Sequence, residues 1–190
     1  LIFSYLYYIA GGPRYVVFIL FSTLVTWLMA LLIEKAEGKE NHKGARKLLI
    51  LGLILNFGML GIVKYTNFAV ENINALLHLN LRGIQLLLPL GISFYTFQSS
   101  GYLLDVYWKR CKAERHPLKY ALFVSFFPQI LQGPIGRYSR LADQLYAEHR
   151  FEGNNIIRGF ERILWGFFKK MILADWAAAF ADAIFEDPAK

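Results

Sequence analysis

Residues 86–140 constrain the fold of this chain more than any other segment. They hold an apolar run of membrane length, a basic loop, and a second apolar run broken by Pro128, Gly133, Pro134 and Gly136. Proline and glycine interrupt regular helices, and the backbone groups that they free find no water inside a bilayer. Such a backbone is tolerated at membrane depth only where protein or a polar cavity surrounds it. The segment therefore predicts a cavity inside a membrane protein.

Composition favours the same class of protein. The chain is 56% hydrophobic and 18% charged, whereas soluble domains carry about 25% charged residues. Its net charge is +7, but the basic residues lie in loops between apolar runs. That placement favours contact with lipid headgroups over nucleic acid. We therefore expect a lipid bilayer and no nucleic acid among its partners. The chain starts inside an apolar run, and we expect it to be an internal piece of a longer protein.

Three apolar runs have the length of a membrane span, which takes about 20 helical residues. They cover 15–33, 48–70 and 86–104, and residues 1–10 are expected to be a partial span. Segments 34–47 and 105–119 hold five basic residues each, whereas 11–14 and 71–85 hold one each. Basic loops stay in the cytoplasm, so 34–47 and 105–119 are predicted to be cytoplasmic. Segments 11–14 and 71–85 are predicted to lie on the opposite side of the membrane.

The remaining segments complete an all-α, polytopic prediction for a single incomplete membrane domain, residues 1–190. A full span at 120–136 would place the following basic residues outside, so we favour a re-entrant hairpin there over a full span. Residues 154–185 show helical periodicity, with apolar and basic faces in their first half. They predict an amphipathic helix at the cytoplasmic interface. The alanine-rich end of that segment either enters the membrane or caps its cytoplasmic side.

A polar stripe marks the candidate cavity wall. Taking 86–105 as a helix with 100° per residue, Tyr95, Gln98, Tyr102 and Asp105 share one face with Gly91. The alternative is a hydrogen-bonded seam between helices.

Other polar residues extend this candidate site. We expect Tyr95, Gln98 and Tyr102 to line a substrate path together with Gln129 and Gln132 of the broken run. Arg137 and Arg140 follow that run on the predicted cytoplasmic side. They either meet a carrier or a phosphate-bearing donor at the cytoplasmic mouth or contact lipid headgroups.

Other chemistry-bearing motifs are missing from the sequence. The histidines lie outside the apolar runs and have no partner at metal-ligand spacing, and the single cysteine supports no disulfide framework. We expect no bound metal. These residues alone supply no complete active site.

Four motifs carry a resemblance to a known family. They are LLPLGISFYTFQSSGYLLDVYWKR, FFPQILQGPIGRYSRLADQL, LNFGMLGIVKYTNF and GFFKKMILAD. The chain resembles the membrane-bound O-acyltransferase (MBOAT) family, in particular its bacterial alginate O-acetyltransferase branch. The D-alanyl-lipoteichoic acid type is a related branch.

The resemblance implies an activity for the longer protein. It implies transfer of an acetyl or acyl group from a cytoplasmic donor, across the bacterial cytoplasmic membrane, to an extracellular polysaccharide hydroxyl or a partner protein. Acetyl-CoA or an acyl-carrier thioester is the implied donor, and an extracellular acyltransferase is an implied partner. The family's catalytic histidine belongs to a motif expected beyond Lys190, so no histidine here receives that role and this segment alone is expected to be inactive. The competing hypothesis is a non-catalytic transporter or exporter subunit whose broken helix lines a substrate path.

Overall fold

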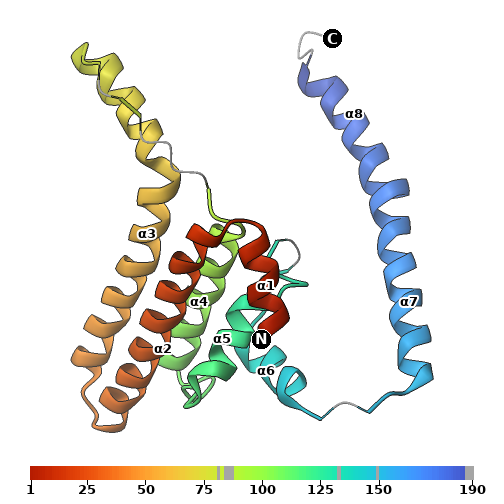
Figure 1. The fold of residues 1–190 in the computed structure, drawn as a ribbon, viewed down its shortest axis with the longest axis horizontal. Helices are drawn as coiled ribbons and strands as arrows, with labels where there is room; N and C mark the ends of the chain where they lie inside the picture. Colours follow the sequence, from red (N-terminus) through yellow and green to blue (C-terminus); the bar gives the residue numbers. More distant parts are fainter. Residues whose placement is uncertain (81, 84–87, 132–133, 149, 187–190) are drawn as a thin grey trace. The chain divides into compact units, whose positions relative to one another are not determined.

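The computed structural model describes residues 1–80, 82–83, 88–131, 134–148 and 150–186. These residues are helical wherever they form regular structure, and no β-strand occurs among them. The chain divides into two compact units, Leu1–Ala147 and Glu148–Lys190, each considered by itself (Figure 1). The helices of the first unit are α1 (Ile2–Ala10), η1 (Pro13–Tyr15), α2 (Val16–Gly38), α3 (His42–Leu77), α4 (Ile92–Tyr107), α5 (Pro117–Ser125) and α6 (Tyr138–Tyr146).

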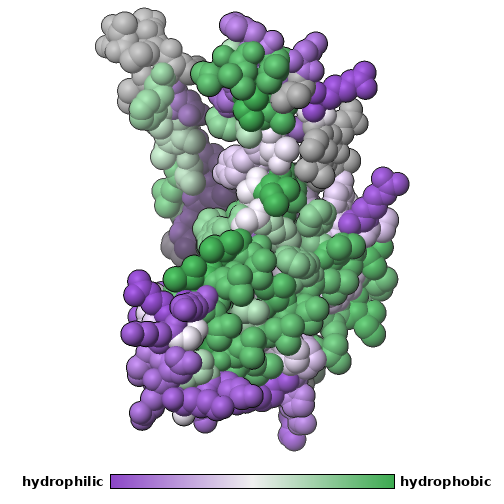
Figure 2. Space-filling view, turned by 90° about the vertical axis from the view of Figure 1, so that its left-hand side faces the viewer, coloured by the Kyte–Doolittle hydropathy of each residue, from purple (hydrophilic) through white to green (hydrophobic). Residues whose placement is uncertain are grey.

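Helix α2 is the centre of the first unit and packs against α3, α4 and α5 (Figure 1). Two helical stretches, Pro13–Gly38 and His42–Leu77, are long and apolar enough to cross a membrane by length and composition. They contain the runs predicted at 15–33 and 48–70. Figure 2 shows a broad hydrophobic band that gives way to hydrophilic residues at one end. Exposed apolar side chains of these two helices include Leu24 and Leu28 of α2 and Ile50 and Ile54 of α3.

The predicted loop at 34–47 is wrong in its local structure. Both helices continue past their apolar runs, so that only residues 39–41 stand between them. The turn is this short because Asn41 caps α3, its Oδ1 accepting a hydrogen bond from the Gly44 N–H at 3.0 Å. The basic residues of this segment therefore lie at or next to the end of α2 and the start of α3.

Helix α4 is shorter than the span predicted at 86–104. It has 16 residues and starts after Gly91, whose φ of 67° is left-handed. A β-carbon at Gly91 would collide with the carbonyl oxygen of Ile130, so glycine is required there for both its conformation and its close contact. Residues 84–87 lie outside the described residues. A third full span at 86–104 is thus not confirmed and stays a prediction, as does the partial span at 1–10, which the structure shows as the nine-residue α1.

The broken run does break in the structure. Helix α5 ends at Ser125, Phe126 leaves the helical conformation, and α6 begins only at Tyr138. Pro128 lies in the irregular segment, whereas Gly133 lies outside the described residues. Whether 120–136 re-enters the membrane as predicted is not decided by this geometry.

A polar clamp joins α2 and α3 inside their apolar interface. Asn56 is fully buried; its Oδ1 accepts from Ser22 Oγ at 2.6 Å and its Nδ2 donates to Thr26 Oγ1 at 3.0 Å. The same amide donates to the Gly52 carbonyl at 2.9 Å. Polar side chains are common links between helices in membranes because they have few other partners there.

The second unit consists of α7 (Gly153–Phe168), a π-helical stretch η2 (Lys169–Ala174) and α8 (Asp175–Glu186). Large apolar side chains of α7, among them Phe160, Ile163 and Phe167, are exposed. Lys170 Nζ pairs with Asp175 Oδ2 at 2.9 Å across the π-helical stretch. The interfacial location predicted for 154–185 is not confirmed and stays a prediction.

Candidate functional site: a polar cavity beside α4

Helix α4 buries its polar residues rather than exposing them. Tyr95, Gln98, Tyr102 and Asp105 are all at most 6% exposed, because α4 packs against α2, α3 and α5. The opposite serine–threonine side is buried too, at Thr96, Ser99 and Ser100. Both alternatives for the stripe therefore receive support from different residues: part of it packs in the bundle, and part of it opens into a cavity.

That cavity has a volume of about 360 Å³ and lies between α4 and the segment before α6. A volume of roughly 300–1,000 Å³ is typical of small-molecule sites. Three predicted site residues, Gln98, Tyr102 and Arg137, line it. The full lining is Gln98, Gly101, Tyr102, Leu104, Asp105, Trp108, Arg110, Ile135, Gly136 and Arg137.

Of the predicted glutamines, Gln98 lines the cavity, whereas Gln129 is not part of the lining and lies beside Gly136, which is. Gln98 Nε2 donates to the Phe123 carbonyl at 3.2 Å, which fixes its amide. A β-carbon at Gly136 would lie 3.3 Å from Gln129 Oε1 and 3.7 Å from Gln98 Nε2. Both amides therefore border the backbone of the same glycine. Gln129 Oε1 is buried and has no hydrogen-bond partner among the described residues.

The remaining predicted residues are not part of this lining. Tyr95 is fully buried inside the bundle, and Arg140 is exposed on α6. Gln132 lies outside the described residues. Helical spacing placed Tyr95 on the same face as Gln98, but α4 lines the cavity only from Gln98 onward.

Charges of both signs line the cavity. Asp105 is nearly buried, and its Oδ1 lies 3.6 Å from Nη1 of Arg110. Arg110 and Arg137 both reach the lining from exposed positions. One carboxylate and two guanidinium groups thus surround a small polar space, which suits a polar or anionic ligand.

An aromatic cluster supports the wall behind Tyr102. Its ring centroid lies 4.7 Å from that of Tyr120 and 4.7 Å from that of Tyr138. Phe123 packs edge-on against Tyr138 at 5.0 Å. These rings come from α4, α5 and α6, so the cluster ties together the elements that surround the cavity.

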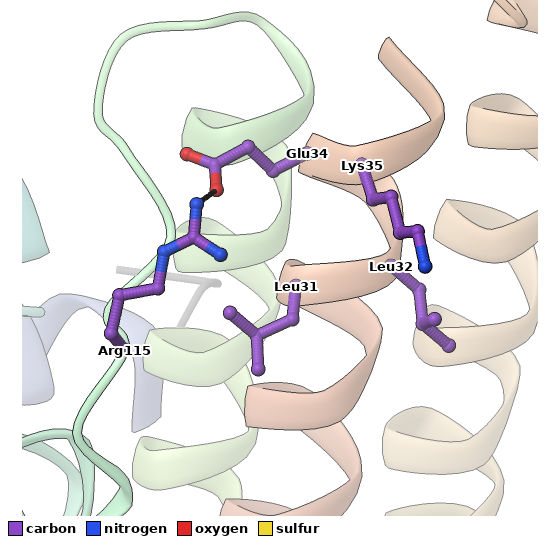
Figure 3. Close-up of a pocket in the computed structure, with 5 residues that line it drawn as sticks. All are labelled: Leu31, Leu32, Glu34, Lys35 and Arg115. Atoms are coloured by element: carbon purple, nitrogen blue, oxygen red, sulfur yellow. Dashed lines mark hydrogen bonds and ion pairs between the residues drawn. The ribbon is translucent and has the colours of Figure 1, made fainter. Parts of the chain in front are cut away.

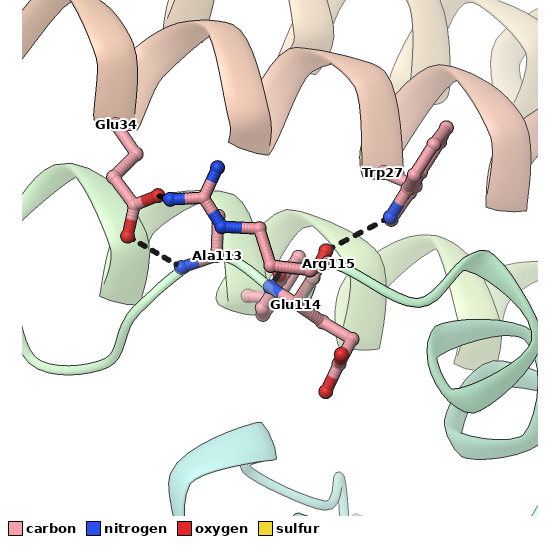
Figure 4. A network of polar contacts seen from close by, with 6 residues as sticks. Trp27, Glu34, Ala113, Glu114 and Arg115 are labelled. Atoms are coloured by element: carbon pink, nitrogen blue, oxygen red, sulfur yellow. Dashed lines mark hydrogen bonds and ion pairs between the residues drawn. The ribbon is translucent and has the colours of Figure 1, made fainter.

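Most of the predicted loop at 105–119 runs back along α2. Within residues 108–116, here called the strap, Lys109 Nζ pairs with Glu37 Oε2 at 3.1 Å. Further along, the Trp27 Nε1–H donates to the Glu114 carbonyl at 2.9 Å (Figure 4). Glu37 and Trp27 are ten residues apart, roughly 15 Å along the helix axis. Carboxylates of α2 thus bind this basic segment and hold it against the helix.

Glu34 is the central anchor of the strap. Its Oε1 accepts from the Ala113 N–H at 3.0 Å, and its Oε2 pairs with Arg115 Nη2 at 2.5 Å (Figures 3 and 4). The ion pair edges a small hollow of about 340 Å³ that Leu31, Leu32 and Lys35 also line (Figure 3). Its charged groups are already paired, so we assign it a structural role.

The two basic segments lie at the same end of the first unit. Glu37 Oε2 accepts both from Lys109 and from Nδ1 of His42, at 3.1 and 2.9 Å. This arrangement agrees with the prediction that 34–47 and 105–119 share one side of the membrane. Among the described residues, no group of three or more metal-ligating side chains comes together.

Residues of structural importance escaped the sequence analysis. Glu114, Glu34 and Asn56 bind partners that are distant in sequence, so periodicity gave no sign of them. The available signal was chemical: an amide within the apolar run 48–70 and a carboxylate at the end of the run 15–33 both need a partner.

Relatives of known name match almost the whole chain. It is 35% identical to a probable alginate O-acetylase, AlgI, of Pseudomonas syringae pv. tomato and 34% identical to that of Pseudomonas aeruginosa, each over 97% of this chain. It is 33% identical to a peptidoglycan O-acetyltransferase of Helicobacter pylori over 96% of this chain. The match covers 36%, 36% and 39% of these relatives, so the chain spans little more than a third of their length.

These homologues confirm the resemblance to MBOAT-like O-acetyltransferases that the sequence motifs indicated. No family model matches the chain. No solved structure matches it either.

Proposed function

We propose that this chain is part of a membrane O-acetyltransferase. The observation that carries the proposal is its similarity, over nearly its full length, to proteins named as alginate and peptidoglycan O-acetylating enzymes. Two apolar helices of membrane length and the exposed hydrophobic band agree with a membrane location. We place the protein in the bacterial cytoplasmic membrane as a multi-pass protein, with 34–47 and 105–119 on the cytoplasmic side.

In this proposal the cavity beside α4 forms a section of the path taken by the acyl group. Gln98, whose amide is fixed by the Phe123 carbonyl, and Tyr102 line this cavity, and the amide of Gln129 lies beside Gly136 of the lining. Arg137 stands at its exposed rim, where it meets an acidic carrier or the phosphates of a thioester donor. Acetyl-CoA or an acyl-carrier thioester is the proposed donor. We keep Gln132 as a candidate of the same path and Arg140 as a candidate of the rim.

No histidine lines the cavity among the described residues. A histidine acting as general base on the acceptor hydroxyl is the family's mechanism, and we place it in the part of the protein beyond Lys190. The acetyl group then reaches a polysaccharide hydroxyl or an extracellular partner protein. This chain contributes the positions of Gln98, Tyr102 and Arg137 on the path.

The proposal is tested with the full-length protein in membranes. Labelled acetyl donor is followed into extracellular polysaccharide for the parent and for Gln98→Ala and Gln129→Ala. We expect at least a tenfold loss of transfer at equal protein level, since losing one preorganised hydrogen bond at a reacting group costs about a hundredfold or more in the best-aligned cases. Asn72→Ala is the control, because Asn72 is exposed on α3 and its amide donates to the Phe68 carbonyl of its own helix.

A second pair of variants tests the rim. Arg137→Gln alters a residue of the cavity lining, whereas Arg140→Gln alters an exposed residue outside it. If only Arg137→Gln loses acetyl transfer, Arg137 alone forms the rim. If both variants lose acetyl transfer, the rim also includes Arg140 of α6. No acetylation by the parent with donor, acceptor and partner present would reject the enzyme and favour a transporter or exporter subunit.

A further inference from the structure

Glu114 joins three helices through three hydrogen bonds and makes another within the strap, although it does not line the cavity. Its backbone N–H donates to Tyr102 Oη of α4 at 2.8 Å, and its carbonyl accepts from Trp27 of α2 at 2.9 Å (Figure 4). Its Oε2 accepts from Tyr138 Oη of α6 at 2.6 Å, and its Oε1 accepts from the His116 N–H at 2.9 Å. One residue of the strap thus contacts α2, α4 and α6.

Two of these contacts fix residues of the cavity lining. Tyr102 belongs to the lining itself, and its hydroxyl is fixed by the Glu114 N–H. Tyr138 is the first residue of α6 and follows Arg137, the residue before the helix, which also lines the cavity. The Glu114 carboxylate therefore fixes the start of α6 next to Arg137. The rings of Tyr102 and Tyr138 pack on each other at 4.7 Å between these two bonds.

The protonation states suit this arrangement. Burial raises the pKa of Glu114, but the hydrogen bond from Tyr138 and those of neighbouring backbone groups outweigh it and leave the pKa below its usual value. Burial and the bond to Glu114 raise the pKa of Tyr138. The proton therefore stays on Tyr138, which donates a charge-assisted hydrogen bond to an ionised carboxylate at neutral pH.

We propose that Glu114 is a positioning residue that sets the geometry of the cavity wall, by holding Tyr102 through its backbone and Tyr138, with the adjoining Arg137, through its carboxylate. This inference rests on the proposed acetyl transfer. Glu114 acts through Tyr102 and Arg137 and does not itself meet the acyl group.

The experiment measures kcat and KM for the acetyl donor in the full-length protein. In Glu114→Ala we expect kcat to fall about tenfold, the scale of one charged hydrogen bond, with KM changing less than threefold. Glu114→Gln keeps one oxygen acceptor and restores kcat to within about threefold of the parent, on the scale of a neutral hydrogen bond. Tyr138→Phe reproduces the loss, and adding it to Glu114→Ala lowers kcat no further, because both changes remove the same bond.

Glu34→Ala is the matched control. Glu34 holds the neighbouring residues Ala113 and Arg115 of the same strap but bonds neither tyrosine. Peptide-resolved alkylation of Cys111, a half-buried strap residue, reports how loosely the strap is bound in each variant. We expect Glu34→Ala to speed alkylation while leaving kcat within about twofold, whereas Glu114→Ala lowers kcat as well.

Each outcome separates the inference from the proposed function. If the parent is active and Glu114→Ala and Glu34→Ala lower kcat equally, both residues merely anchor the strap, and the positioning role of Glu114 is overturned. Additive losses of kcat in the Glu114→Ala and Tyr138→Phe double variant overturn it as well. An active parent with unchanged Glu114→Ala kcat overturns it too. A parent that transfers no acetyl group overturns both. Tyr138→Phe and Glu114→Gln, which preserve size, replace Glu114→Ala in this comparison if that variant does not accumulate.

Discussion

Replacing Asn56 tests how the two longest helices are held together. Its side chain makes three hydrogen bonds, to Ser22, Thr26 and the Gly52 carbonyl, and is fully buried. Hydrogen bonds between side chains in membrane proteins contribute about 0.6 kcal/mol each on average. Three of them amount to roughly 2 kcal/mol. We therefore expect Asn56→Ala to lower the free energy of unfolding by about that amount, with any cavity left by the smaller side chain adding to it.

The assay is reversible unfolding of the full-length protein in mixed micelles, followed by loss of helix signal. Asn72→Ala is the control on the same helix, since Asn72 is exposed and its amide donates to the Phe68 carbonyl, four residues earlier. We expect it to change stability by less than about 0.5 kcal/mol, as for most surface substitutions. The Ser22→Ala and Asn56→Ala double-mutant cycle should give a coupling of about 0.6 kcal/mol.

A triple replacement sharpens the test. Ser22→Ala, Thr26→Val and Asn56→Leu together remove every side-chain partner of the clamp, leaving none of these polar groups unpaired. Replacing both partners of a buried hydrogen bond by apolar groups of similar shape is often nearly neutral, so the triple variant should be more stable than Asn56→Ala. If Asn56→Ala lost less than about 0.5 kcal/mol, or the triple variant were the least stable of all, the reasoning would be refuted.

Three further predictions concern the site and the strap. Gly91→Ala should lower the free energy of unfolding by more than about 1–2 kcal/mol, the cost of a left-handed conformation for a non-glycine residue, because the new β-carbon also meets the Ile130 carbonyl. Gly58→Ala has open space around it and should not destabilise the protein. Unfolding of both variants measures the difference. Burial, together with nearby carboxylates, raises the pKa of Cys111 to about 11 from 9.0. Alkylation of Cys111 at pH 7.5 should therefore be about a hundredfold slower than alkylation of a cysteine introduced at exposed position 112. Comparable rates would contradict this. The lowered pKa of Glu114 means that its contribution to stability is present above the pKa of the unfolded state and is lost as pH falls through the lower folded value; the stability difference between the parent and Glu114→Gln should therefore vanish in acid, and a difference independent of pH would refute it.

The sequence predicted the helices of the first unit better than their ends. Apolar runs located α2 and α3, but the helices extend beyond those runs wherever capping and charge allow, as at Asn41. The 34–47 segment shows why the helix ends were mispredicted. Hydropathy detects the part of a helix that is suited to lipid, but it does not detect the charged residues that continue the same helix. For α4 the error was in the other direction, because Gly91 begins the helix late through its left-handed conformation.

The candidate site was predictable only as far as helical geometry reaches. Spacing placed Gln98 and Tyr102 together, and both line the cavity. Spacing cannot tell which part of a stripe meets a neighbouring helix, so Tyr95 was included although it is buried in the bundle. The role of the strap depends on pairs such as Glu34 with Arg115, 81 residues apart. Such pairs leave no periodic signal in a single sequence.

The shortness of α4 has a consequence for the surrounding lipid. Its 16 residues correspond to roughly 24 Å, whereas the hydrocarbon core of a bilayer is about 30 Å thick. The 36-residue α3 beside it exceeds that thickness. In the proposed enzyme, with α4 as a membrane span, such unequal neighbours impose hydrophobic mismatch, which a bilayer relieves by thinning locally. In the proposed enzyme, thinning shortens the distance that the acetyl group must travel, so transfer in reconstituted vesicles should be faster in lipids with shorter acyl chains.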